Sequence, residues 1–256
     1  MRRVLAVVTV LLPVVILLTL TVTYLVAPGF YLTYVLHPDH RETQAVEIAT
    51  FAGLLLAGLL FVPATVTVWR GTRLDGGGRR DWGGWLAVGV VASLAAAALF
   101  TAGEEIDWGD SYGLYGEQRR GGSANKLNLH NASVLPVKSI GNVYLAVVFF
   151  ALPGLWLLRR RLNLPASLGR AVPPWPVVVA MGVAAAWREV KDVYRSATGD
   201  VGERRRPPAG IYWDFIEQIN EHKELLIAVA FVCFALYLYL PPREDDTAVR
   251  PPPEVA

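Results

Sequence analysis

The stretch "WLAVGVVASLAAAALFTAGEEIDWG", residues 85–109, decides the fold. It holds no charged residue before Glu104, and its apolar part is close to the roughly 20 residues that a helix needs to cross the hydrocarbon core of a bilayer. It then ends directly in Glu104, Glu105 and Asp107. The stretch therefore predicts a transmembrane helix over residues 85–103 with acids gathered at one end.

Similar apolar runs occur throughout the chain, which has 256 residues, of which 54% are hydrophobic. A soluble globular domain is seldom this apolar. We therefore predict an all-α, polytopic helical membrane protein with about six transmembrane helices and an interfacial amphipathic helix. A single transmembrane domain would cover residues 1–240, and residues 241–256 form a Pro-rich, charged tail that we expect to be disordered. The six predicted spans cover residues 4–26, 46–69, 85–103, 137–158, 173–190 and 224–240.

Composition excludes several kinds of site. Cys233 is the only cysteine, so the chain can form neither an intrachain disulfide nor a metal site built from cysteines. The formal net charge is +2, and the arginines stand in short clusters beside apolar runs, as topology signals do. We expect no nucleic-acid partner.

Two short basic connections indicate the orientation. The segments "WRGTRLDGGGRR", residues 69–80, and "RRRLNLPASLGR", residues 159–170, lie on the same side as both termini if six spans alternate. Short loops rich in arginine remain in the cytoplasm. We therefore predict a multi-pass protein of the bacterial inner (plasma) membrane with both termini cytoplasmic.

The opposite face carries most of the groups able to do acid–base or metal chemistry. All but six of the 22 Asp and Glu residues lie there, with all four histidines. Glu104 and Glu105 are the first candidates for catalysis, because neighbouring acids in a low-dielectric site favour one protonated carboxyl group. Trp108 would contact substrate. The alternative is a solvated helix end with Trp108 as an interfacial anchor.

The segment "NKLNLHNASVLP", residues 125–136, supplies the next candidates. His130 precedes the fourth span, and histidine is both the commonest metal ligand and a proton carrier near neutral pH. We predict a catalytic or metal-binding His130, with Asn128 and Asn131 binding substrate. The alternative is a turn in which Asn131 or Ser133 caps the following helix.

Two further span ends complete the predicted site. In "IYWDFIEQINEHKELLIAVAF", residues 211–231, helical spacing predicts an amphipathic helix that runs into the sixth span. Glu217 is a predicted substrate-binding residue there and His222 a predicted metal ligand, and Glu224 would point at the same outer pocket. Glu47, at the start of the second span, is a further substrate-binding candidate. For residues 211–231, the alternative is a helix with an ordinary polar face and an ordinary apolar face. For Glu47, the alternative is an acid that only complements the dipole of the second span.

Parts of the chain resemble a set of uncharacterised bacterial multi-pass membrane proteins. These carry AGEEISWGQRIFG followed by QGETNLHN, whereas this chain has "AGEEIDWG" at residues 102–109 and "NLHN" at residues 128–131. Weaker likeness surrounds Glu47 and residues 220–224. The chain departs from the pattern at Asp107, where the pattern has Ser, and in the loop between the two motifs. The resemblance implies family membership, without an activity.

These observations predict an outer-face polar site, which belongs to a hydrolase or transferase acting on a lipid or lipid-linked substrate. Zn or another divalent metal would be held by His130, His222 and Glu104. One alternative is an ion- or proton-coupled transporter, since carboxylates inside a membrane mark ion paths. The other is a non-catalytic membrane partner or assembly protein, which would bind a protein through its outer loops or its Gly/Ala-rich helix faces.

Overall fold

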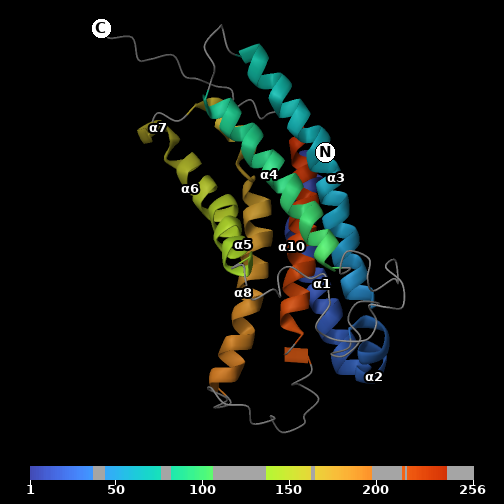
Figure 1. The fold of residues 1–256 in the computed structure, drawn as a ribbon. Coiled ribbons are helices and arrows are strands. Elements are labelled where there is room, and N and C mark those ends of the chain that lie inside the picture. The colour runs from blue at the N-terminus through green and yellow to red at the C-terminus, as the bar shows by residue number, and fades with distance from the viewer. Residues whose placement is uncertain are drawn as a thin grey trace.

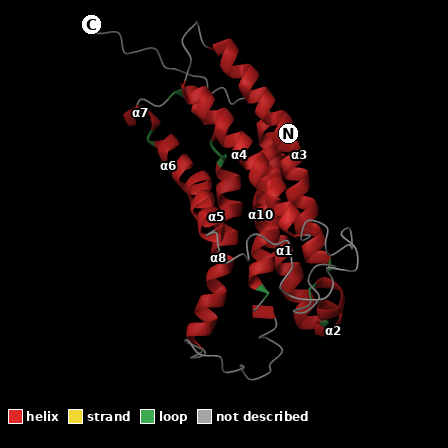
Figure 2. Ribbon diagram, in the orientation of Figure 1, coloured by secondary structure: helices red, strands yellow, loops and turns green. Residues whose placement is uncertain are grey.

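The computed structural model describes residues 1–36, 44–75, 82–105, 137–162, 165–197, 215–216 and 218–240. Over these ranges the chain is built of helices and short connections, and the described part holds no strand (Figure 2). The predicted all-α class is therefore confirmed.

Five long helices and one composite helix make up the bundle. The long ones are α1 (Arg2–Val26), α3 (Ala45–Asp75), α4 (Trp82–Glu105), α8 (Trp175–Ala197) and α10 (Ile219–Leu238). The composite helix runs through α5 (Val137–Ala146), the π-helix η6 (Val147–Ala151) and α6 (Leu152–Leu157). The short elements are α2 (Pro28–Phe30), the π-helix η1 (Tyr31–Val35), α7 (Arg159–Leu162) and the 3-10 helix η7 (Ala166–Ala171).

Successive long helices run in opposite directions along one bundle (Figure 1). The N-terminus and the end of α10 meet at the same end of the bundle, where the Arg2 guanidinium donates a hydrogen bond to the Leu240 carbonyl oxygen at 3.4 Å. The start of α3, the end of α4 and the start of α10 lie toward the opposite end (Figure 1). The described helices therefore alternate in direction (Figure 1), whereas six membrane spans stay a prediction.

Four helical segments are long and apolar enough to cross a membrane by length and composition. They are Arg2–Val26, Ala45–Gly71, Trp82–Glu105 and Ser139–Leu157. The predicted spans 173–190 and 224–240 coincide with α8 and α10, which are not among the four. The reason is charge: α10 carries Glu221, Lys223 and Glu224 in its first two turns, and the last third of α8 is similarly charged.

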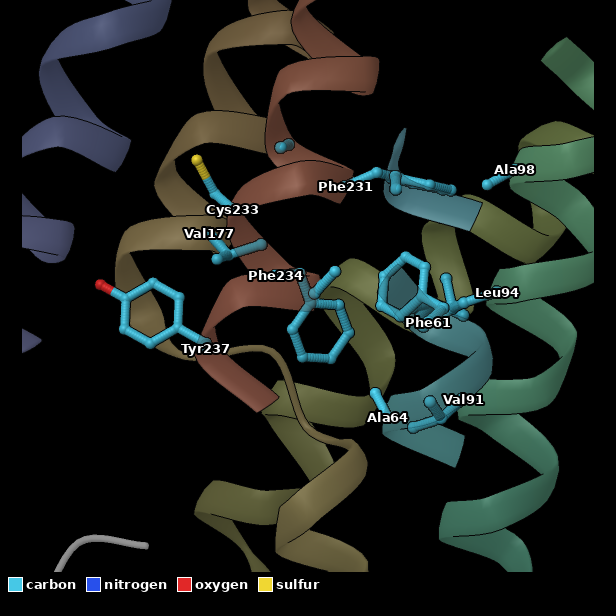
Figure 3. Close-up of a cluster of buried hydrophobic side chains, with 14 of the residues drawn as sticks. Phe61, Ala64, Val91, Leu94, Ala98, Val177, Phe231, Cys233, Phe234 and Tyr237 are labelled. Atoms are coloured by element: carbon cyan, nitrogen blue, oxygen red, sulfur yellow. The ribbon is translucent and has the colours of Figure 1, made fainter. Parts of the chain in front are cut away.

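The main core lies between α3, α4 and α10 (Figure 3). Phe61 of α3 packs against Phe234 of α10 with ring centroids 5.8 Å apart, and Phe149 stacks on Phe231 at 5.5 Å. Leu94 of α4 closes the same cluster (Figure 3). Inside a bilayer such contacts stabilise the bundle by close packing, because lipid tails are as apolar as the side chains.

The Gly/Ala-rich face of α4 is covered within this chain. Ala95, Ala98 and Ala102 are buried in the core shared with α3 and α10. At Gly58 of α3, a Cβ atom would lie only 2.6 Å from Cγ of Leu99, so the two helices are in close contact there. Small residues thus bring α3 and α4 together, as they do in membrane bundles generally.

Candidate functional site

Four carboxyl groups from three helices gather at the bundle end opposite the N-terminus. We call this cluster the acidic end, formed by Glu47, Glu105, Glu221 and Glu224. The Glu47 carboxyl group hydrogen bonds with the carboxyl groups of both Glu105 and Glu221. Glu221 and Glu224 also lie close enough to act electrostatically on both Glu47 and Glu105. The cluster exists because α3 begins, α4 ends and α10 begins at a similar level.

The acidic end is partly withdrawn from solvent. Glu47 is only 8% exposed, and the other three residues are partly buried. An ionised carboxylate can only accept hydrogen bonds, so two carboxyl groups bond to each other only when a proton lies between them. The contacts of Glu47 with Glu105 and with Glu221 therefore require at least two bound protons among the three carboxyl groups.

Glu105 pairs with an acid on another helix. The sequence suggested that Glu104 and Glu105 share one site, and the structure shows Glu105 bonded to Glu47 of α3. Glu104 is buried as well, with 4% of its surface exposed. It lies one residue earlier, about 100° around the helix from Glu105. The carboxyl groups that the structure brings into contact are thus those of Glu47 and Glu105.

A second buried polar group surrounds His222, which is fully buried. The Tyr31 hydroxyl lies 2.5 Å from its Nε2 atom, and the Trp187 indole nitrogen donates a hydrogen bond to its Nδ1 atom at 3.4 Å. Phe215 packs on the imidazole with ring centroids 5.0 Å apart. We call Tyr31, Trp187 and His222 the His222 group; its members come from η1, α8 and α10.

The hydrogen bonds of the His222 group determine its protonation. Because Nδ1 accepts the Trp187 N–H, we assign the ring proton to Nε2, which then donates to the Tyr31 oxygen. Burial raises the pKa of the Tyr31 hydroxyl, and Tyr24 adds to this rise. Both partners are therefore neutral, and the imidazole could take up a proton at Nδ1 only by losing its bond to Trp187.

The predicted site residues divide into three sets. The structure brings Glu47 and Glu105 together, whereas His222 packs against Tyr31 and Trp187. Glu104 is buried on α4 and precedes Glu105 in the sequence. Five other predicted residues lie outside the described part of the chain: Trp108, Asn128, His130, Asn131 and Glu217.

The predicted metal site is not formed by residues that the structure describes. In those ranges no group of three His, Cys, Asp or Glu side chains could hold a metal ion. His222 could ligate a metal only by giving up one of its two hydrogen bonds. A metal held by His130, His222 and Glu104 stays a prediction, because His130 lies outside the described ranges.

Sequence reasoning missed three residues that the structure brings into these clusters. Glu221 carried a usable signal, because it shares a helical face with Glu224. Tyr31 and Trp187 carried none, since aromatic residues near span ends are ordinary interfacial anchors.

Comparison with known proteins does not indicate a function, so the functional argument rests on the geometry described above. No protein-family model, no curated protein and no solved structure matches the chain. The likeness to multi-pass membrane proteins with a GEEISWGQ and NLHN pattern stays a prediction.

Proposed function

We propose that this chain is a six-span membrane protein whose functional centre is the acidic end. One proton lies between Glu47 and Glu105 and another between Glu47 and Glu221, and Glu47 and Glu105 act as an acid–base pair. The substrate is a lipid or lipid-linked molecule that reaches the pair from the membrane interface, and the reaction is hydrolysis or group transfer. The observation that carries the proposal is the hydrogen bonding of Glu47 to carboxyl groups from two other helices.

A proton-sharing pair of carboxyl groups supplies both catalytic forms at one pH. Like charges in contact cannot both ionise freely, so one group keeps the proton and the other remains a base. The protonated member can protonate a leaving group, and the ionised member can activate water or a hydroxyl nucleophile. Glu221 and Glu224 add negative charge, which helps to retain the proton.

The interior of the helix bundle is apolar. This favours a functional site at one end of the bundle over an ion or proton path through the bundle. Ion and proton paths are lined by polar groups through the depth of a membrane. Beyond the acidic end, the described core between α3, α4 and α10 is filled by side chains such as Phe61, Leu94 and Phe234 (Figure 3). This packing favours an enzyme over a transporter.

The basic residues favour an extracytoplasmic acidic end. Arg2 lies beside Leu240 at the opposite bundle end. Arg170 packs directly over Gly71 near the end of α3, where its guanidinium occupies the space that a Cβ would take. With the positive-inside rule, these arginines support cytoplasmic termini and an acidic end on the outer face.

A lipid-turnover experiment tests the proposal. The purified protein would be reconstituted in liposomes of total bacterial lipid, with and without added lipid-linked sugars, and the lipids followed by mass spectrometry. We expect a new product with wild type and its loss in Glu105→Gln. Glu189→Gln is the matched control, because Glu189 is an exposed acid on α8. Unchanged lipids in every sample would contradict a lipid-directed enzyme.

Metal content of the same samples separates two versions of the chemistry. Elemental mass spectrometry would compare wild type with His130→Ala and Glu104→Gln. A stoichiometric divalent metal lost in both variants would support metal-assisted hydrolysis. Equal, sub-stoichiometric metal in all samples would support the metal-free acid–base pair.

A further inference from the structure

The His222 group and the acidic end are built on the same two turns of α10. Glu221 and Glu224 face α3 and α4, where they act on Glu47 and Glu105. His222 lies between them in sequence but contacts η1 and α8. Successive residues of an α-helix are about 100° apart, so this helix start presents two polar faces to two different sets of neighbours.

The rotation of α10 about its axis decides whether the acidic end forms. A turn of about 100°, one residue position, would bring His222 to the direction that Glu221 now occupies. Apolar packing specifies such a rotation less sharply than hydrogen bonds do, because dispersion has no preferred direction whereas hydrogen bonds weaken steeply off axis. The start of α10 therefore needs directional contacts.

The His222 group supplies these contacts. Gln218, which precedes α10, makes no side-chain cap hydrogen bond to the helix, and its buried amide atoms have no hydrogen-bond partner in the described part of the chain. His222 instead bonds through both ring nitrogens to two elements on different sides, Tyr31 of η1 and Trp187 of α8. Hydrogen bonds at both nitrogens of one planar ring fix the orientation of the ring, and they thereby fix the rotation of α10 about its axis.

We infer that His222 is a positioning residue: held by Tyr31 and Trp187, it sets the rotation of α10 so that Glu221 and Glu224 face Glu47 and Glu105. The importance of this role rests on the proposed function of the acidic end. The role itself is geometric and stands on the contacts of His222. Its neutral ring with both nitrogens bonded suits it to hold a position and not to carry protons.

A cross-linking experiment tests this role without reference to activity. In a Cys233→Ala background, Glu47→Cys and Glu221→Cys would be joined by a short thiol-specific bifunctional reagent, and the yield measured after a brief exposure. Tyr31→Phe and Trp187→Phe each remove one hydrogen bond to His222. We expect either variant to lower the cross-linking yield roughly two- to tenfold. This is the change expected when the oriented state loses one hydrogen bond worth about 0.5–1.5 kcal/mol.

Two comparisons separate positioning from general weakening. His222→Leu should lower the yield further, whereas His222→Gln, which can still donate and accept, should restore part of it. Phe234→Leu is the matched control: it lies in the apolar core of the same helix and should lower stability without changing the yield. Equal yields in wild type, Tyr31→Phe and Trp187→Phe would overturn the inference, as would an equal loss in Phe234→Leu.

The outcome is separable from that of the proposed function. If the yield falls as expected while no lipid product forms with wild type, the positioning role holds and the enzymatic proposal fails. If lipid turnover depends on Glu105 but the yield is insensitive to Tyr31 and Trp187, the acid–base pair holds and the positioning role is wrong.

Discussion

The two halves of α10 contrast two ways of specifying a structure. Toward its C-terminus, Phe231 and Phe234 pack against other aromatic rings in a core without charge (Figure 3). Near its N-terminus, Glu221 and His222 make hydrogen bonds to one acid and two aromatic residues of three other elements. The first region tolerates any side chains that fill the space, whereas the second depends on particular atoms meeting at particular angles.

The difference predicts opposite consequences of mutation. Substitutions that create cavities in the apolar core should lower the free energy of unfolding without changing proton binding at the acidic end. Changes at the acidic end alter proton binding at little cost in stability, because functional sites hold groups that repel one another. The following variants test this contrast from the largest expected effect on stability to the smallest.

Phe234→Ala should produce the largest loss. Phe234 is 1% exposed, with ring contacts to Phe61 and Phe149 at 5.8 and 6.3 Å. Removing the ring should lower the free energy of unfolding by about 3–5 kcal/mol. Circular dichroism during titration of mixed micelles with dodecyl sulfate measures this. A loss no larger than that of an exposed substitution such as Leu59→Ala would show that the ring is not packed as described.

Gly58→Ala should destabilise the contact between α3 and α4 by about 1–3 kcal/mol, because the new methyl group would overlap Leu99. Gly89→Ala is the matched control. A Cβ at Gly89 of α4 meets nothing within 4 Å, so this change should be neutral or stabilise by up to about 1 kcal/mol. The same titration compares the two variants, and equal effects would count against the close helix contact.

Tyr31→Phe should change the response of stability to alkaline pH. Burial raises the pKa of Tyr31 above its ordinary value of 10.0. Above pH 10 the unfolded chain therefore loses this proton while the folded chain keeps it, so stability falls as pH rises. The slope should be steeper in wild type than in Tyr31→Phe by up to about 1.4 kcal/mol per pH unit. Unfolding titrations from pH 9 upward measure it, and parallel curves would contradict a buried, neutral Tyr31.

Glu105→Gln should have the smallest effect on stability, within about 1 kcal/mol of wild type, because it removes charge repulsion while keeping a hydrogen-bonding group. The same variant should abolish lipid turnover. A large loss of stability in Glu105→Gln would instead indicate that the carboxyl cluster is a structural element.

The sequence predicted the parts of this structure that depend on hydropathy. The apolar run before Glu104 is α4, and the alternation of spans placed Glu47 and Glu105 on one face. The charges of α8 and α10 fitted the expectation for membrane spans less well, since both helices carry charged turns at one end.

The pairing of side chains could not be predicted from one sequence. That Glu105 contacts Glu47 depends on the rotation of α4 against α3. That His222 faces Tyr31 depends on where η1 lies after α1. Rotations and heights of helices follow from the sum of many contacts. Spacing within one helix identifies a face but not the neighbour that the face meets.

The proton shared by Glu47 and Glu105 is the central claim, and infrared spectroscopy tests it most directly. Protonated carboxyl groups have a carbonyl stretch that is separate from the bands of carboxylates. We expect wild type at neutral pH to show this band. Glu47→Gln should weaken it more than Glu105→Gln, because Glu47 makes both carboxyl contacts, while the exposed control Glu189→Gln retains it in full. Carboxylate bands alone in wild type, or a band of unchanged intensity in both Glu47→Gln and Glu105→Gln, would contradict the account.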